Sequence, residues 1–243
     1  VRVNDGEANS NTYALQVTVV SVNDPPVFNS IANVVILEDA VQQTLTITGI
    51  SPGPLETQQL LFTATSDNTA LIPQPVQTPT YNGTATSAVI SFKPEPNAFG
   101  TATITVKVTD PDFAEFTRTF TITVTSVNDA PTLTAISVPP IVEDAPEQII
   151  PLTGITTGGG LAESGQVLTF IPSTNKPELF ELFEVVYVSP QATGSLRLKP
   201  KPNVNGTAQI TLRLQDDGSG TAPNVNFVVR TFSLVITPVN DLP

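Results

Sequence analysis

Acidic and amide side chains recur along this sequence at a spacing as long as a domain. The phrase Val-Asn-Asp-x-Pro occurs at 22–26, 127–131 and 239–243, and a Glu-Asp-Ala triplet occurs at 38–40 and 143–145. Carboxylates gathered in turns and linkers repel one another unless a cation neutralises them. Calcium accepts roughly six to eight oxygen ligands in flexible geometry, whereas magnesium prefers to keep its waters, so these residue types indicate calcium chemistry.

Three groups of candidate calcium ligands follow if alternate turns of each repeat lie at opposite ends. At the middle junction, the end of one repeat, the linker and the start of the next repeat contribute Glu38, Asp39, Glu95, Asn97, Asn128, Asp129, Glu163, Asp216 and Asp217. The first junction contributes Asn23, Asp24, Glu56, Asp110 and Asp112. The last contributes Glu143, Asp144, Asn203, Asn205, Asn240 and Asp241. The alternative is that these are solvated turn residues, because Asp and Asn satisfy local backbone groups in turns.

The elements that must position these ligands are β-strands. Residues 101–108 and 116–124 alternate polar and apolar side chains at period two, and proline and glycine clusters separate such runs. We expect strands at 31–37, 42–48, 59–65, 75–81, 87–93, 101–109 and 115–127, and again at 136–142, 148–153, 166–171, 182–188, 195–199, 207–215 and 225–237. Seven short strands per repeat predict an all-β fold of tandem seven-stranded antiparallel immunoglobulin-like sandwiches. The expected buried side chains are Ile104, Val106, Phe120 and Ile122, with the counterparts Ile210, Leu212, Phe232 and Leu234.

Internal repetition also predicts the domain organisation. Residues 24–129 and 130–243 are expected to be complete repeats, because a Pro-Asn-x-x-Gly-Thr-Ala loop at 96–102 recurs at 202–208. Residues 1–23 match only the last two runs of a repeat, so we expect them to be the C-terminal hairpin of a preceding one. The apolar face of that hairpin would be bare unless an upstream domain or another chain covers it; it comprises Tyr13, Leu15, Val17 and Val19.

Composition excludes several classes of function. The chain has no cysteine and no histidine, which removes disulfides, thiolate sites and the usual general base. Ten basic against 22 acidic residues argue against nucleic acid or an anionic membrane as a partner, and no apolar run predicts membrane insertion of this segment. The grouped carboxylates recur with the repeat, whereas a catalytic site normally occurs once. We therefore expect no enzyme activity.

The chain resembles the cadherin-like, immunoglobulin-like VND-x-P tandem repeats of large bacterial extracellular, adhesin-type proteins. The resemblance is carried by the linker phrase, the Glu-Asp-Ala triplet and the Pro-Asn-x-x-Gly-Thr-Ala loop, and it covers essentially the whole chain. It implies an extracellular or cell-surface location, neighbouring repeats of the same protein as partners, and calcium held between successive domains.

Three functions remain open. The first is a calcium-rigidified spacer or adhesive stalk, in which the linker at 128–131 would be a hinge when no cation is bound. The second is a segment of a self-assembling filament, sheath or surface layer, with identical chains as partners. The third is a carbohydrate-binding sandwich that recognises surface glycans, for which the stretch Phe180, Phe183 and Tyr187 offers aromatic side chains. The alternative is that Phe180 and Phe183 belong to the core or to an irregular strand entry.

Overall fold

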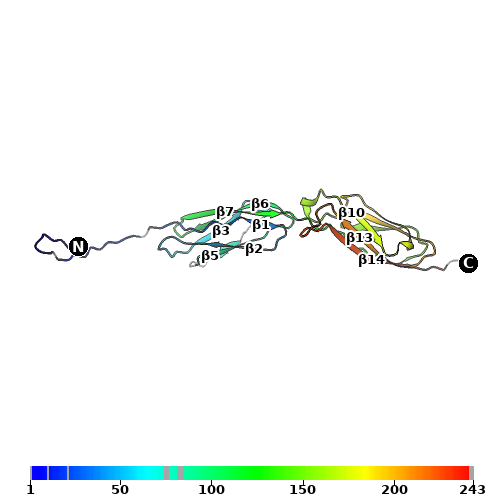
Figure 1. Cartoon of the computed structure of the whole chain (residues 1–243), viewed down its shortest axis with the longest axis horizontal. Helices are drawn as coiled ribbons and strands as arrows, with labels where there is room; N and C mark the ends of the chain where they lie inside the picture. Colours follow the sequence, from blue (N-terminus) through cyan, green and yellow to red (C-terminus); the bar gives the residue numbers. More distant parts are fainter. Residues whose placement is uncertain (1, 10, 21, 74–76, 81–84, 241–243) are drawn as a thin grey trace.

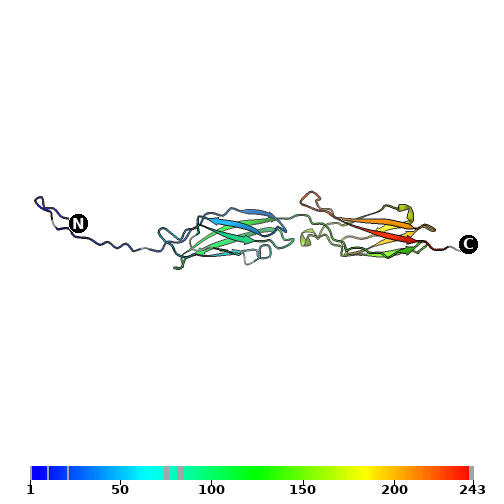
Figure 2. The same cartoon turned by 90° about the horizontal axis from the view of Figure 1, so that it is seen from below.

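The computed structural model describes residues 2–9, 11–20, 22–73, 77–80 and 85–240. Two β-sandwiches lie end to end along one long axis, and the residues before Asp24 run out from the far end of the first sandwich (Figures 1 and 2). None of the described residues forms a helix long and apolar enough to cross a membrane.

The first sandwich contains seven strands in two sheets. The strands are β1 (Val34–Leu37), β2 (Gln43–Thr48), β3 (Leu61–Ser66), β4 (Gln77–Thr80), β5 (Ser87–Phe92), β6 (Gly100–Thr109) and β7 (Glu115–Thr125). One sheet has the order β1-β7-β6-β3 and the other has the order β2-β5-β4. Strand β1 runs parallel to β7, and the other paired strands are antiparallel.

The second sandwich repeats this arrangement. Its strands are β8 (Ile141–Val142), β9 (Gln148–Thr153), β10 (Thr169–Thr174), β11 (Phe180–Val186), β12 (Thr193–Pro200), β13 (Gly206–Gln215) and β14 (Phe227–Thr237). The orders are β8-β14-β13-β10 and β11-β12-β9, with β8 parallel to β14. Two short 3-10 helices that the pattern did not predict, η1 (Gly160–Glu163) and η2 (Pro177–Leu179), lie in its loops. The predicted all-β sandwich is confirmed, with one parallel pair in each copy.

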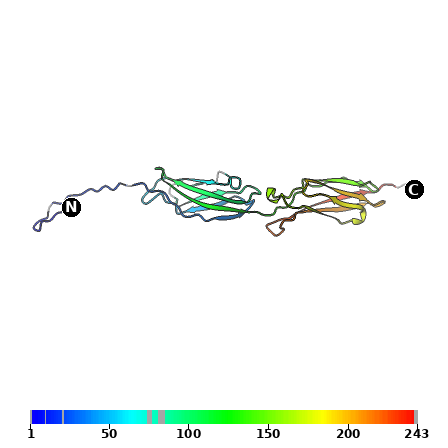
Figure 3. The ribbon, with the colours of Figure 1, turned by 90° about the horizontal axis from the view of Figure 1, so that it is seen from above.

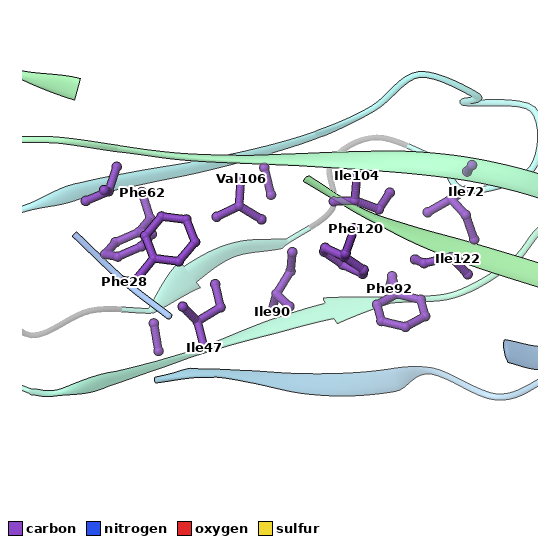
Figure 4. Close-up of a cluster of buried hydrophobic side chains, with 14 of the residues drawn as sticks. Phe28, Ile47, Phe62, Ile72, Ile90, Phe92, Ile104, Val106, Phe120 and Ile122 are labelled. Carbon is purple, nitrogen blue, oxygen red and sulfur yellow. The ribbon is translucent and has the colours of Figure 1, made fainter. Parts of the chain in front are cut away.

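The core of each sandwich lies between its two sheets, as the alternation predicts. In the first sandwich Ile104, Val106, Phe120 and Ile122 are at most 2 % exposed, and their side chains fill the space between the layers (Figure 4). In the second sandwich Ile210, Leu212 and Leu234 are fully buried. The prediction was wrong for Phe232, which is only partly buried although it packs against the core.

The difference at Phe232 goes together with a shorter outer strand. Strand β1 pairs with β7 over four residues, Val34–Leu37, whereas β8 pairs with β14 only through Ile141 and Val142. Pro139 and Pro140 precede β8 at the positions that correspond to Val34 and Val35. Proline has no N–H to donate to a ladder, so the second copy begins its strand two residues later and leaves this side of β14 more open.

Residues before Asp24 form no strand among those that the structure describes. An isolated bridge joins Asn4 to Asn9, and the described residues from 11 to 20 are exposed and extended. The hairpin expected here is thus reduced to its turn. A two-stranded hairpin with nothing to pack against is marginally stable in water, which accounts for the difference.

Candidate functional site

A short linker joins the two sandwiches (Figure 3), and side chains from both of them accept hydrogen bonds from its backbone. The Val127 N–H donates to Glu38 Oε1 of the first sandwich at 2.6 Å. The next two N–H groups donate to the second sandwich, Asn128 to Asn224 Oδ1 at 2.7 Å and Asp129 to Glu163 Oε1 at 2.6 Å. Three consecutive linker amides are therefore bonded, which differs from the expectation of a free hinge.

The end of the first sandwich that faces the linker is fixed at the turn that follows β1. Glu38 is 4 % exposed, and its own N–H donates to the Thr125 carbonyl at 2.9 Å, which continues the β1–β7 ladder. Asp39 follows with a φ of 58°, and its Oδ1 accepts the Asn97 N–H at 2.9 Å. This left-handed turn, which Asp tolerates better than most residues, turns the Glu38 carboxylate back toward the linker.

The end of the second sandwich that faces the linker surrounds the side chain of Asn128. Its Nδ2 donates to Asp216 Oδ1 at 3.2 Å and to the Val225 carbonyl at 2.9 Å, while its Oδ1 accepts a hydrogen bond from Gln166. Asp216 is 3 % exposed, and its Oδ1 also accepts the Gly218 N–H at 2.8 Å. A Cβ at Gly218 would collide with the Asn128 side chain, so only glycine fits this close approach.

Glu163 is the second buried carboxylate at this end. The helix η1 positions it so that its Oε1 accepts the Asp129 N–H and its Oε2 accepts the Gly159 N–H at 2.7 Å. Burial raises the pKa of Glu163 above its ordinary value, and the neighbouring charges of Asp129 and Asp216 act in the same direction. The pKa of Asp129 is raised as well, first by burial and then by the negative charge of Asp39. Negative charge is thus unfavourable at this junction.

Two carboxylate oxygens at the junction are buried without a hydrogen-bond partner among the residues that the structure describes. They are Glu38 Oε2 on the first sandwich and Asp216 Oδ2 on the second, and the amide oxygen of Gln166 shares this condition. A buried acceptor that no donor reaches costs free energy, and more so when it is charged. The site therefore has spare oxygen ligands of the kind that a hard cation binds.

The remaining candidates of the middle junction are placed less centrally. Glu95 is exposed, and Asp217 is exposed while its Oδ1 accepts the Val167 N–H at 3.0 Å. Within the described part of the chain, no three acidic side chains are grouped closely enough to hold a metal ion.

The first junction repeats this capture of the linker. Asn23 Nδ2 donates to Asp110 Oδ2 at 2.9 Å, and the Asp24 N–H donates to Glu56 Oε1 at 2.9 Å. These contacts match those of Asn128 with Asp216 and of Asp129 with Glu163, so both linkers bind the sandwich that follows them. The predicted candidate Asp112 is exposed beside them.

The last junction repeats the contacts of Glu38, with one addition. Glu143 Oε1 accepts the Val239 N–H at 2.9 Å, and Asn205 Nδ2 donates to Glu143 Oε2 at 3.1 Å. Asp144 Oδ1 accepts the Asn203 N–H at 3.0 Å, as Asp39 does from Asn97. Of the other two candidates, Asn240 is exposed and Asp241 lies outside the described residues.

Sequence reasoning missed the amide side chains that complete these contacts. Gln166 bonds to Asn128, and Gln58 bonds in the same way to Asn23 Oδ1, at 3.0 Å. Their signal in the sequence is a glutamine two or three residues after the glutamate that accepts the linker N–H. Asn224 offers no such signal. It accepts the Asn128 N–H, and among the described contacts no side chain of the first sandwich accepts the Asn23 N–H in the same way.

A shallow groove of about 550 Å³ lies on the first sandwich, at the end where Asn23 contacts Asp110. Its lining includes Leu61, Lys107, Asp110, Phe113 and Glu115. Phe113 is 86 % exposed and has a φ of 66°, a conformation that is strained for a bulky residue. The groove thus combines an exposed aromatic ring with carboxylates.

No family model matches the chain, and no curated protein matches it. Among solved structures, domains 1–4 of protocadherin gamma B3 match with a TM-score of 0.49 and 15 % identity, over 91 % of this chain and 52 % of that one. Domains 3–6 of protocadherin gamma B7, in a cis-dimer structure, give 0.46 and 16 %, over 89 % and 48 %. Titin domains Z1Z2, in complex with telethonin, give 0.36 and 14 %, over 90 % and 100 %.

The chain thus spans about half the length of the protocadherin chains that it matches. Since these scores are low, the cadherin-like and immunoglobulin-like sandwich is assigned from the strand order of the chain itself. The resemblance to bacterial VND-x-P repeats stays a prediction.

Proposed function

We propose that the chain is a non-catalytic extracellular structural or adhesive module, a stalk whose middle junction binds calcium and thereby becomes more rigid. The observation that carries the proposal is the pair of buried oxygens, Glu38 Oε2 and Asp216 Oδ2, that lack a hydrogen-bond partner on opposite sides of one linker. A divalent cation supplies what both oxygens lack, because it neutralises their charge and accepts them as ligands.

The donor set favours calcium over the transition metals. Every candidate ligand at the junction binds through oxygen, and the chain contains neither histidine nor cysteine. The carboxylates of Glu38 and Asp216 would hold the ion from the two sandwiches, and the ion would supply positive charge. Since no three acidic groups converge among the described residues, we expect the side chains to move closer together on binding.

The extracellular location is supported by the resemblance and by the calcium concentration that such sites need. Extracellular calcium modules bind at about 10⁻⁴–10⁻³ M, a range that suits the outside of a cell. Two sandwiches arranged end to end, with the linker bonded to both, form an extended unit suited to spacing (Figure 1). Neighbouring repeats of the same protein are the expected partners.

The test compares Glu38→Gln with the matched control Glu143→Gln. Both remove one carboxylate charge at equivalent turns, but both oxygens of Glu143 are already bonded. Calorimetric titration with calcium chloride should show affinity reduced about tenfold or more by E38Q, since calcium affinity follows the number of charged ligands. E143Q should leave it within about twofold of the unchanged chain.

Small-angle scattering of the same three proteins, in calcium and in chelator, measures the rigidity. Calcium should reduce flexibility in the unchanged chain and in E143Q, and should have less effect in E38Q. Equal scattering in calcium and chelator for the unchanged chain, together with no binding heat, would show that the linker contacts alone set the rigidity and that the calcium proposal is wrong.

A second candidate function is glycan binding at the groove beside Phe113. An exposed, strained aromatic ring next to the exposed ion pair of Lys107 and Glu115 offers a stacking surface with polar groups beside it. Binding of the chain to a panel of immobilised oligosaccharides should be lost in F113A and kept in F99A, which removes an exposed ring elsewhere. Equal binding by both variants, or none by the unchanged chain, would exclude this groove.

A further inference from the structure

The segment at 11–20 has the side-chain pattern of the last strand of each sandwich. With Asn23 aligned to Asn128 of the next linker, Leu15, Val17 and Val19 fall on Phe120, Ile122 and Val124 of β7. With Asn23 aligned to Asn240, the same three residues fall on Phe232, Leu234 and Ile236 of β14. The segment therefore carries apolar residues at the positions that face the core in both complete sandwiches.

The environment of these matched residues is opposite. Leu15, Val17 and Val19 are 72 %, 74 % and 87 % exposed, whereas Phe120, Ile122 and Val124 are 2 %, 0 % and 2 % exposed. A contiguous stripe of apolar side chains on a soluble segment marks an interaction surface. Its alternation at period two suits a sandwich core that is covered on one face only.

Neither complete sandwich has a place for this strand. Strand β7 lies between β1 and β6, and β14 lies between β8 and β13, so each sandwich already contains its own last strand. A second copy of the chain has the same two positions filled, and it offers only the outer edges of its sheets. A partner that fits must lack a last strand.

The turn and the linker next to the segment also follow the pattern of a complete repeat. An aspartate accepts backbone N–H groups at the matched position of each turn, although the donors differ: Asp5 Oδ1 accepts from Glu7 and Ala8, both at 3.0 Å, whereas Asp110 Oδ1 accepts from Ala114 in the turn between β6 and β7. At the other end of the segment, Asn23 and Asp24 bind the first sandwich with the contacts that Asn128 and Asp129 make with the second.

We propose that residues 2–20 are the last hairpin of a third sandwich of this kind, and that Leu15, Val17 and Val19 pack against strands equivalent to β1–β6 of that sandwich. The third sandwich would then sit against the first one through the same linker contacts as the first does against the second. This inference is independent of calcium at the middle junction.

The test extends the full chain with a copy of its own residues 24–105, placed ahead of the first residue. This fusion puts residue 1 at the position that follows Thr105 in the first sandwich, so that the hairpin completes the added strands in the matched register. Hydrogen exchange, read by mass spectrometry, should show amides at 15–19 protected on the order of 100-fold more than in the unextended chain.

Two controls separate the proposed partner from other ways of covering the stripe. Deleting one residue at the fusion point turns the apolar side chains to the opposite face, and protection should be lost. In the unextended chain, L15D together with V17D should leave unfolding of both sandwiches unchanged. Exchange at 15–19 that stays fast in the extended protein overturns the proposal. Protection that rises with the concentration of the unextended chain also overturns it, because a second copy would then be the partner.

Discussion

The two complete sandwiches share strand order and turn geometry, but they treat one equivalent carboxylate differently. Glu38 and Glu143 each accept the valine N–H of the linker that follows, yet only Glu143 has a donor for its second oxygen. That donor is Asn205, and Phe99 stands at the corresponding position in the first sandwich. The difference teaches that the repeat fixes where the carboxylate lies, while a single neighbouring side chain decides whether it has a spare ligand.

The outer strands differ in a second way that affects the core. The ladder between β1 and β7 covers the first sandwich up to Ile122, whereas the ladder between β8 and β14 starts only at Ile236. Phe120 is consequently buried and its counterpart Phe232 is half-covered. The two copies therefore should not respond alike to the same substitution.

The largest effect that we expect separates these two rings. F120A should lower the unfolding free energy of the first sandwich by about 3–5 kcal/mol, because it leaves a cavity in a packed core. F232A should cost about half as much or less, since part of that ring is already in contact with water. Denaturant titration, with hydrogen exchange of each sandwich as the readout, measures the loss of unfolding free energy in both variants. Equal losses would show that the two cores are equally closed.

A smaller effect is expected from exchanging the residues beside the two carboxylates. F99N places an amide where the first sandwich lacks a donor, and it should raise the unfolding free energy in chelator by about 1–2 kcal/mol while weakening calcium binding. N205F removes the donor to Glu143 and should destabilise the second sandwich by about 1–3 kcal/mol. If F99N binds calcium as the unchanged chain does, then Glu38 Oε2 is not a ligand.

The smallest effect concerns pH and compares two glutamates of the second sandwich. Burial raises the pKa of Glu163, so its contribution to stability is present below its ordinary value of 4.5 and is lost as pH rises through the raised value. The Arg197 side chain lowers the pKa of Glu147, so that contribution is present above 4.5 and is lost as pH falls through the lowered value.

Melts in chelator across acidic and neutral pH should therefore change in opposite senses when each group is neutralised. E163Q should remove a loss of stability that occurs on raising the pH, and E147Q should remove a loss that occurs on lowering it. Parallel pH profiles for the two variants would contradict the assigned environments.

Much of the fold could be predicted from the sequence because alternation reports directly on which face is buried. The runs that become β6, β7, β13 and β14 show this most clearly, since their inward residues are apolar at every second position except at Arg118 in β7 and Arg230 in β14. The expected strand at 136–142 is shortened to Ile141–Val142 by the prolines before it. The 3-10 helix η1 was not predicted because a glycine-rich stretch has no periodicity to recognise.

The candidate site could be predicted only in part. The repeated phrase places Glu38, Asn128 and Asp129 at the junction, since linkers and turns are fixed by the repeat itself. Which oxygen of a carboxylate finds a donor depends on side chains far apart in the chain, as with Asn205 and Glu143. A sequence pattern carries no information about such a pair until the fold brings it together.

The parallel pairing of the outer strands determines how this chain would respond to tension along its long axis. Pulling on the two ends of a sandwich slides β1 against β7, or β8 against β14, so the bonds of each ladder are loaded together in shear. Four residues of β1 share that load in the first sandwich, but only two residues of β8 share it in the second. We expect the second sandwich to yield first, and single-molecule stretching should show two separate rupture forces whose order is reversed if this reading of the ladders is wrong.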